Sequence, residues 1–157
     1  MVADDWNEDK YTQAAWSTIS PLSKVADYYQ TQIIESHYLL DVLINPSKHN
    51  AADNAEATRG VANKILFSAG VNLHELRQEL NTFLAKQLKG TENSAKKQMG
   101  KTLPKVFQSA RQTMSVLGDS FVSVEGLILA LVKEDNIFTT AAFLKQGVKY
   151  TDVLAAV

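Results

Sequence analysis

The sequence contains no cysteine, only three prolines and seven glycines, and no long apolar run. The missing cysteines exclude structural disulfides and thiolate chemistry. No apolar run approaches the roughly 20 residues that span a bilayer, so we expect no membrane partner. The opening residues MVADDWNEDK are acidic and polar, which fits neither a secretory signal nor an Arg/Ser-rich transit peptide. If the natural protein is imported into an organelle, we expect its targeting segment to lie outside this sequence.

Charge and length narrow the class of protein further. The 157 residues include 16 basic and 17 acidic side chains, for a net charge of −1. Nucleic acid is therefore not an expected partner, because phosphate binding needs clustered Lys and Arg. The length falls within the roughly 100–200 residues usual for one domain. A chain of this size buries about 70% of its unfolded surface and needs no disulfide or metal to hold its core. We therefore expect residues 1–157 to form a single domain.

Apolar residues in the first half recur at helical spacing and are interrupted by helix-breaking and capping signals. Pro21 lies inside the first such pattern and predicts a break near Ser20, because proline lacks a backbone donor. Ser36 is placed as the N-cap of a Leu-rich helix that ends before Asn45-Pro46. Gly70 predicts a left-handed end to the next helix, and Asn72 can cap the one that follows. Residues 47–58, SKHNAADNAEAT, are polar and turn-rich.

The second half repeats this order. Residues 88–101 have no apolar period and are typical of a linker. A helix then ends at Gly118, a second is capped by Ser123, a third ends at Gly147, and Thr151 begins a short fourth. The stretches QTQIIESHYLLDVL (30–43) and GDSFVSVEGLILAL (118–131) match at an offset of 88 positions, which indicates an internal repeat. The prediction is an all-α domain of two pseudo-twofold-related four-helix repeats, at about 11–86 and 102–157, joined by a linker at about 87–101.

Motifs for catalysis, nucleotide binding or metal binding are missing. Gly100-Lys101-Thr102 has the ending of a phosphate-binding loop, but Ala95 stands where that motif requires glycine, and no preceding strand is evident. The three histidines, His37, His49 and His74, lie in different segments without the spacing of a zinc site, so we expect them to be solvated or near helix caps. We therefore expect no enzyme activity, cofactor or metal in this domain.

Three stretches together resemble the Clp N-terminal repeat, which occurs twice in the N-terminal domain of Clp ATPases. They are YTQAAWSTI (11–19), PLSKVADYYQTQIIESHYLL (21–40) and GDSFVSVE (118–125). The resemblance is strongest to the ClpB-type protein disaggregases of cyanobacteria and plastids, and covers about residues 11–157. It implies a globular all-α domain that engages unfolded or aggregated polypeptide and assists its delivery to the ATPase ring of its own chain. ATP and Mg²⁺ would be bound elsewhere in the parent chain, in the cytoplasm or the plastid stroma.

The same resemblance implies a substrate surface that includes Thr12, Asp119 and Glu125, beside an apolar groove between the repeats. Each residue also has a local structural role open to it: a helix cap for Thr12, a turn for Asp119, and a favourable place near the helix dipole for Glu125. Tyr11 and Trp16 are expected to be core or partly buried aromatics, which would join a partner-binding patch only if exposed.

The sequence departs from the family pattern at two places in these helices. His37-Tyr38 replaces the common Glu-His pair, and Gly126 stands where an apolar residue or histidine is usual. Glycine inside a helix costs about 1 kcal/mol relative to alanine. Gly126 is also expected to flatten the surface beside Glu125 and so to change the shape of the groove.

A second hypothesis remains open beside the disaggregase assignment. The chain could be the adaptor-docking N-terminal domain of a ClpC-type protease partner, or a stand-alone accessory protein with the same repeats. That hypothesis predicts tight, stoichiometric binding to one folded partner. The disaggregase hypothesis predicts weak binding to many unfolded chains, because affinity there comes from apolar burial and charge.

Overall fold

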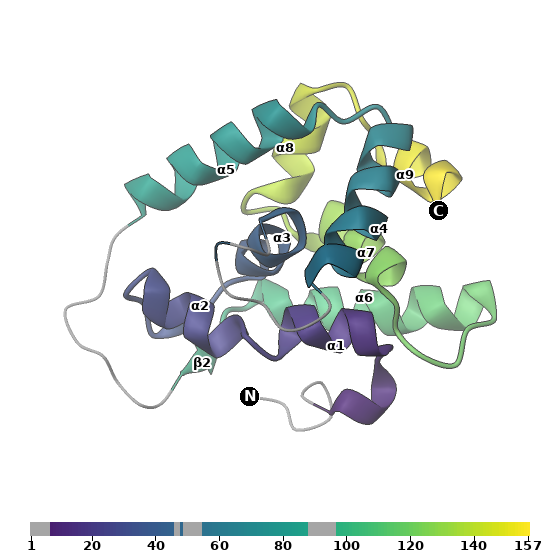
Figure 1. Cartoon of the computed structure of the whole chain (residues 1–157), viewed down its shortest axis with the longest axis horizontal. Helices are drawn as coiled ribbons and strands as arrows, with labels where there is room; N and C mark the ends of the chain where they lie inside the picture. Colours follow the sequence, from purple (N-terminus) through teal and green to yellow (C-terminus); the bar gives the residue numbers. More distant parts are fainter. Residues whose placement is uncertain (1–6, 46–47, 49–54, 88–96) are drawn as a thin grey trace.

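In the computed structural model the described residues are 7–45, 48, 55–87 and 97–157, with only the backbone described at 55–59. Most of the polar segment at 47–58 and most of the expected linker therefore lie outside the described residues. The described part is an all-α fold, as predicted (Figure 1).

Helices account for nearly all the regular structure. The first half contains the 3₁₀-helix η1 (Glu8–Lys10), α1 (Gln13–Ile19), α2 (Leu22–Tyr28), strand β1 (Ile33–Ile34), α3 (Ser36–Ile44), α4 (Ala55–Ser68) and α5 (Leu73–Lys86). The second half contains strand β2 (Gln98–Met99), α6 (Thr102–Leu117), α7 (Val124–Glu134), α8 (Thr139–Lys145) and α9 (Tyr150–Ala156). The predicted break at Pro21 separates α1 from α2, and α9 begins one residue before the predicted start at Thr151.

Glycines end three of these helices in the left-handed conformation, as predicted. Gly70, Gly118 and Gly147 have φ values of 94°, 76° and 75°. Without a Cβ atom, glycine adopts this conformation at no steric cost. Residues just beyond each turn bond back into the helix that has ended; for example, the amide of Asp119 donates to the carbonyl of Met114 at 2.9 Å.

Helices α3 and α7 form the centre of the molecule. Every residue of α3 is buried, and α7 is buried from Leu127 to Val132. The helices α1, α4 and α6 all contact α7, and α3 lies between α1, α2 and α4. A helix with apolar residues on most of its sides is suited to such a site, which explains why these two segments carry the Leu-rich stretches of the sequence repeat.

Two short parallel pairings relate the two halves of the chain. Ile34 of β1 pairs with Met99 of β2, and Tyr11 forms a parallel bridge with Val122. Val122 lies 88 positions after Ile34, and Met99 lies 88 positions after Tyr11. The same offset of 88 positions relates the Leu-rich stretches. Each pairing is thus the counterpart of the other, with the roles of the two halves exchanged, as a pseudo-twofold axis requires. Residues 98–99 were expected in the linker. They correspond instead to residues 10–11, just ahead of α1.

Ser36 has a different role from the predicted N-cap. The cap position of α3 is Glu35, which makes no side-chain capping bond. The Ser36 hydroxyl instead donates to the carboxylate of Asp135, with both side chains fully buried. The prediction was wrong because a serine just ahead of an apolar run can serve equally well as a cap or as a buried cross-link to a distant helix.

Candidate peptide-binding surface at the α6–α7 loop

Thr12 lies at the start of α1 and is held there by its own side chain. It is the N-cap residue, and its hydroxyl accepts a hydrogen bond from the amide of Ala15 at 3.1 Å. The side chain is half-buried. Thr12 thus has the structural role that the sequence allowed, and its remaining surface lies at the edge of the molecule where the chain enters α1.

Backbone hydrogen bonds fasten this edge to the segment ahead of α7. The amide of Thr12 donates to the carbonyl of Val122, and the amide of Val122 donates to the carbonyl of Lys10, both at 2.9 Å. Val122 stands three residues after Asp119 and three before Glu125. The fold therefore brings Thr12 beside the segment that carries both predicted carboxylates, although over 100 residues separate them in sequence.

Asp119 presents its carboxylate at the tip of the α6–α7 loop. The residue is exposed, and its amide is used by the turn that ends α6. Within the described part of the chain its carboxylate has no hydrogen-bond or ion-pair partner. Asp119 therefore belongs to the turn through its backbone, while its side chain is available at the surface.

Glu125 is oriented by the first turn of α7. Ser123 is the N-cap of this helix, as predicted, and its hydroxyl accepts from the amide of Gly126 at 3.2 Å. Glu125 is half-buried in that first turn, where a carboxylate interacts favourably with the helix dipole. The cap fixes the direction of the helix and hence the place of this carboxylate relative to the loop.

Three exposed apolar side chains accompany these carboxylates. Val116 and Leu117 end α6 with 86% and 44% of their surfaces exposed, and Phe121 in the loop is 51% exposed. We call the set of Thr12, Asp119, Glu125 and these three side chains the α6–α7 surface. Val116 and Leu117 were not predicted as site residues. The apolar stripe of α6 runs through Leu103, Phe107, Ala110 and Met114. Val116 falls outside it, which was an available signal, whereas Leu117 continues its spacing, so no sign in the sequence indicated that this residue is exposed.

Tyr11 and Trp16 support this surface from below. The Tyr11 ring is 6% exposed, 5.8 Å from the Trp16 ring and 6.3 Å from that of Phe107, measured between centroids. Trp16 is half-buried. Tyr11 is thus a core residue with little side-chain surface for a partner, and Trp16 is the member of the pair with surface to offer.

Gly126 faces the interior, so its expected effect on the surface was wrong. The residue is buried, and a Cβ atom there would meet the Ala110 carbonyl at 3.8 Å and Val122 at 3.9 Å. These are ordinary contact distances, and they point toward α6. The glycine therefore leaves the shape of the surface beside Glu125 unchanged.

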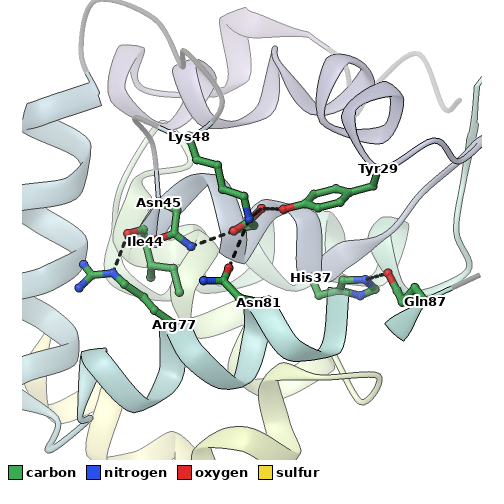
Figure 2. Close-up of polar contacts among 9 residues, drawn as sticks. Tyr29, His37, Ile44, Asn45, Lys48, Arg77, Asn81 and Gln87 are labelled. Carbon is green, nitrogen blue, oxygen red and sulfur yellow. Dashed lines mark hydrogen bonds and ion pairs between the residues drawn. The ribbon is translucent and has the colours of Figure 1, made fainter. Parts of the chain in front are cut away.

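A buried polar cluster lies around α3 (Figure 2). The fully buried carboxylate of Asp41 accepts hydrogen bonds from the Tyr29 hydroxyl and, at 2.9 Å, from the Asn45 side chain, and lies 3.6 Å from the Lys48 ammonium. Burial, followed by this hydrogen bond, raises the pKa of Tyr29. A buried carboxylate needs such partners, so the cluster has a structural explanation.

His37 lies in the same region as the second residue of α3, so it is near a helix cap, as one of the two expectations had it, but it is not solvated. It is fully buried, its Nε2 is 3.2 Å from the Gln87 side-chain oxygen, and its Nδ1 has no partner among the described residues. Burial lowers the pKa of His37, despite the opposing influence of Asp135. His74 is exposed, and His49 lies outside the described residues.

Metal and nucleotide chemistry have little basis in the described residues. No group of His, Asp or Glu side chains among them is arranged to hold a metal ion. In Gly100-Lys101-Thr102, Lys101 is exposed and Thr102 begins α6, while the preceding strand β2 has two residues. Ala95 lies outside the described part.

Comparison with known proteins decides the family. The profile of the family described as the Clp repeat (R) N-terminal domain matches residues 10–146. The chain belongs to this family. Relatives with similar sequences include the chaperone protein ClpB of Gloeobacter violaceus, 30% identical over 128 residues, and the chloroplastic chaperone protein ClpB3 of Arabidopsis thaliana, 30% identical over 127 residues. These alignments cover 82% and 81% of this Clp N-terminal domain but only 13% and 12% of the relatives.

Solved structures agree on the fold. The Hsp104 N-terminal domain from Candida albicans superposes with a TM-score of 0.73 at 14% identity, covering 94% of this chain and 88% of that one. The N-terminal domain of the caseinolytic protease associated chaperone ClpD from Arabidopsis thaliana gives a TM-score of 0.61, with 96% of both chains covered. Among the residues that the structure describes, no helix combines the length and apolar character needed to cross a bilayer.

Proposed function

We propose that this chain is the substrate-engaging N-terminal domain of a ClpB-type disaggregase and that it binds unfolded or aggregated polypeptide at the α6–α7 surface. The observation that supports this most directly is the pairing of Thr12 with Val122. This pairing brings the start of α1 beside the α6–α7 loop and the helix ends that flank it, which together carry two carboxylates and three exposed apolar side chains.

The chemistry of the surface suits weak binding of many extended chains. Apolar surface of a substrate can be buried against Val116, Leu117 and Phe121. Such burial contributes roughly 25 cal/mol of binding free energy for each Å² removed from water. Asp119 and Glu125 attract Lys- and Arg-bearing segments, with each exposed pair contributing at most about 1 kcal/mol. Binding of this kind selects unfolded segments that are both basic and apolar, without requiring one sequence.

The domain contributes recognition, and the remainder of its parent chain would contribute ATP hydrolysis. The chain spans about an eighth of the length of its ClpB relatives, which leaves room there for ATPase modules with ATP and Mg²⁺. The sequence carries no complete nucleotide-binding motif, so we propose that this domain is not itself an enzyme. We also propose the bacterial cytoplasm or the plastid stroma as its compartment, in keeping with bacterial and chloroplastic relatives.

Affinity measurements with matched variants test the assignment. Fluorescence anisotropy would follow binding of a permanently unfolded basic protein, reduced and alkylated ribonuclease A. We expect Asp119→Asn and Glu125→Gln each to weaken binding by about two- to fivefold. Glu75→Gln is the control, because Glu75 is also in the first turn of a helix but lies in α5. Equal affinities for all four proteins would refute the proposed site.

Removal of an exposed ring provides an independent test of the apolar part of the surface. Phe121→Ala should weaken binding, whereas Phe67→Ala, which removes a ring that is 78% exposed on α4, should not. The adaptor hypothesis gives a different result: saturable, one-to-one binding to a folded partner and no affinity for the unfolded protein.

A further inference from the structure

A pocket lies at the end of α7 away from the α6–α7 loop, where α7, α8 and α9 meet. It has a volume of about 350 Å³, and its lining includes Val132, Thr140, Leu144, Val148 and Tyr150. Val132 and Val148 are almost fully buried, whereas Leu144 is 57% exposed. The volume lies at the small end of the roughly 300–1,000 Å³ typical of ligand pockets. We call this site the α7–α9 pocket.

The corresponding place in the first repeat is crossed by an arginine. At the glycine turns the two copies are offset by the distance from Gly70 to Gly147, so Asn63 is the counterpart of Thr140, and Arg77 that of Leu154. In the first repeat the Arg77 guanidinium donates to the Ile44 carbonyl at 3.1 Å and to the Asn63 side chain at 3.3 Å (Figure 2 shows the first contact). One side chain thus connects the end of α3 with the middle of α4.

The second repeat lacks that bridge. The counterpart of Ile44 is Val132, whose carbonyl accepts directly from the Thr140 hydroxyl at 2.8 Å. Leu154, at the position of Arg77, is 42% exposed. The backbone polar group is therefore satisfied locally, and no long side chain is required to cover it.

The charges at the rim indicate what the pocket can accept. Lys133 in the last turn of α7 and Lys149 ahead of α9 both line it and are exposed, and neither has an ion-pair partner among the described residues. The nearby carboxylate of Asp152 accepts the Lys149 amide at 2.8 Å. An apolar pocket with two ammonium groups at its rim complements an apolar side chain flanked by carboxylates.

We propose that the α7–α9 pocket is a docking site for a partner peptide in which one large apolar side chain is flanked by Asp or Glu. Its charge preference is the reverse of that of the α6–α7 surface. The two sites lie at opposite ends of α7, about 15 Å apart at 1.5 Å per helical residue. A partner held through an acidic segment therefore leaves the other surface free, and this proposal stands independently of the proposed function.

Two labelled peptides test the proposal on the isotope-labelled chain. One carries a single leucine among aspartates and glutamates, and the other has lysines in place of the acidic residues. We expect the acidic peptide to shift the NMR signals of Val132, Leu144 and Val148, and the lysine peptide to leave them unchanged. Absence of shifts at these residues, or equal shifts with both peptides, would overturn the proposal.

Charge variants separate recognition from general electrostatic attraction. Lys133→Gln combined with Lys149→Gln should weaken binding of the acidic peptide by about three- to tenfold. Lys24→Gln combined with Lys105→Gln removes the same charge from exposed sites on α2 and α6 and should have little effect. Leu154→Arg, which introduces the arginine that the first repeat carries at this position, should reduce the shifts in a folded protein. Equal losses of affinity in both double variants would contradict a specific site. Asp119→Asn, in the other surface, should leave the affinity for this peptide unchanged.

Discussion

The Ser36 hydroxyl donates a 2.7 Å hydrogen bond to the Asp135 carboxylate, and the two fully buried residues are 99 positions apart. Ser36 lies in the first turn of α3, and Asp135 ends α7. The same carboxylate accepts from the amide and the hydroxyl of Thr139 at 3.1 and 2.6 Å. One buried carboxylate therefore connects the central helix of the first repeat with the α7–α8 junction of the second.

Ser36→Ala is expected to lower the free energy of unfolding by about 1–3 kcal/mol. The substitution removes a donor to a buried carboxylate, which has no access to replacement water. Urea unfolding followed by circular dichroism measures the change. Ser115→Ala, at an exposed position on α6, is the control and should change stability by less than about 0.5 kcal/mol. Equal stabilities of the two variants would contradict a structural role for this bond.

Tyr29→Phe tests the second buried carboxylate, Asp41. Loss of the hydroxyl that donates to Asp41 should again lower the free energy of unfolding by about 1–3 kcal/mol. Tyr28→Phe is a matched control, because the adjacent ring is 58% exposed and the change should be smaller. If Tyr28→Phe proves the more destabilising of the two, the account of the Asp41 cluster is wrong.

Local signals in the sequence predicted much of the fold because their causes are local. Pro21 breaks a helix by lacking a donor, Gly118 ends one by accepting a left-handed φ, and Ser123 caps one with its own side chain. The pairing of Ile34 with Met99 was missed because two residues per strand give no alternation to recognise.

The candidate site was predictable in a different way. Thr12, Asp119 and Glu125 came from resemblance, since a cap, a turn residue and a first-turn carboxylate are individually unremarkable in a sequence. Their proximity depends on the Val122 pairing, which is a long-range contact. The buried positions of Ser36 and His37 likewise depend on α5 and α7 packing around α3, which no local pattern encodes.

Gly126→Ala is expected to stabilise the protein by about 0.5–1 kcal/mol. Alanine reduces the conformational entropy of the unfolded chain and has room for its Cβ atom here. Thermal unfolding measures the change. Gly70→Ala should do the opposite, because its φ of 94° disfavours a side chain. Destabilisation by Gly126→Ala would show that the space beside Ala110 is tighter than the structure indicates.

The free energy of unfolding should decrease as the pH is lowered below about 6.5, the pKa of an unperturbed histidine. Burial lowers the pKa of His37 in the folded state, so in this range the unfolded chain binds a proton that the folded chain does not. Glu35, whose pKa is raised by burial, acts in the opposite sense as the pH approaches its own titration. The free energy of unfolding of the unmodified protein and of His37→Gln, measured from pH 7.5 to 5, isolates the histidine. The decline should be shallower in the variant, and parallel curves would rule out His37 as its source.

The most direct test of the central claim is an amide-shift NMR titration of the isotope-labelled chain with reduced and alkylated ribonuclease A. We expect shifts clustered at Thr12, Asp119, Phe121 and Glu125, and smaller shifts with Asp119→Asn. A well-dispersed spectrum that shows no shifts, or shifts confined to residues away from the α6–α7 loop, would contradict it.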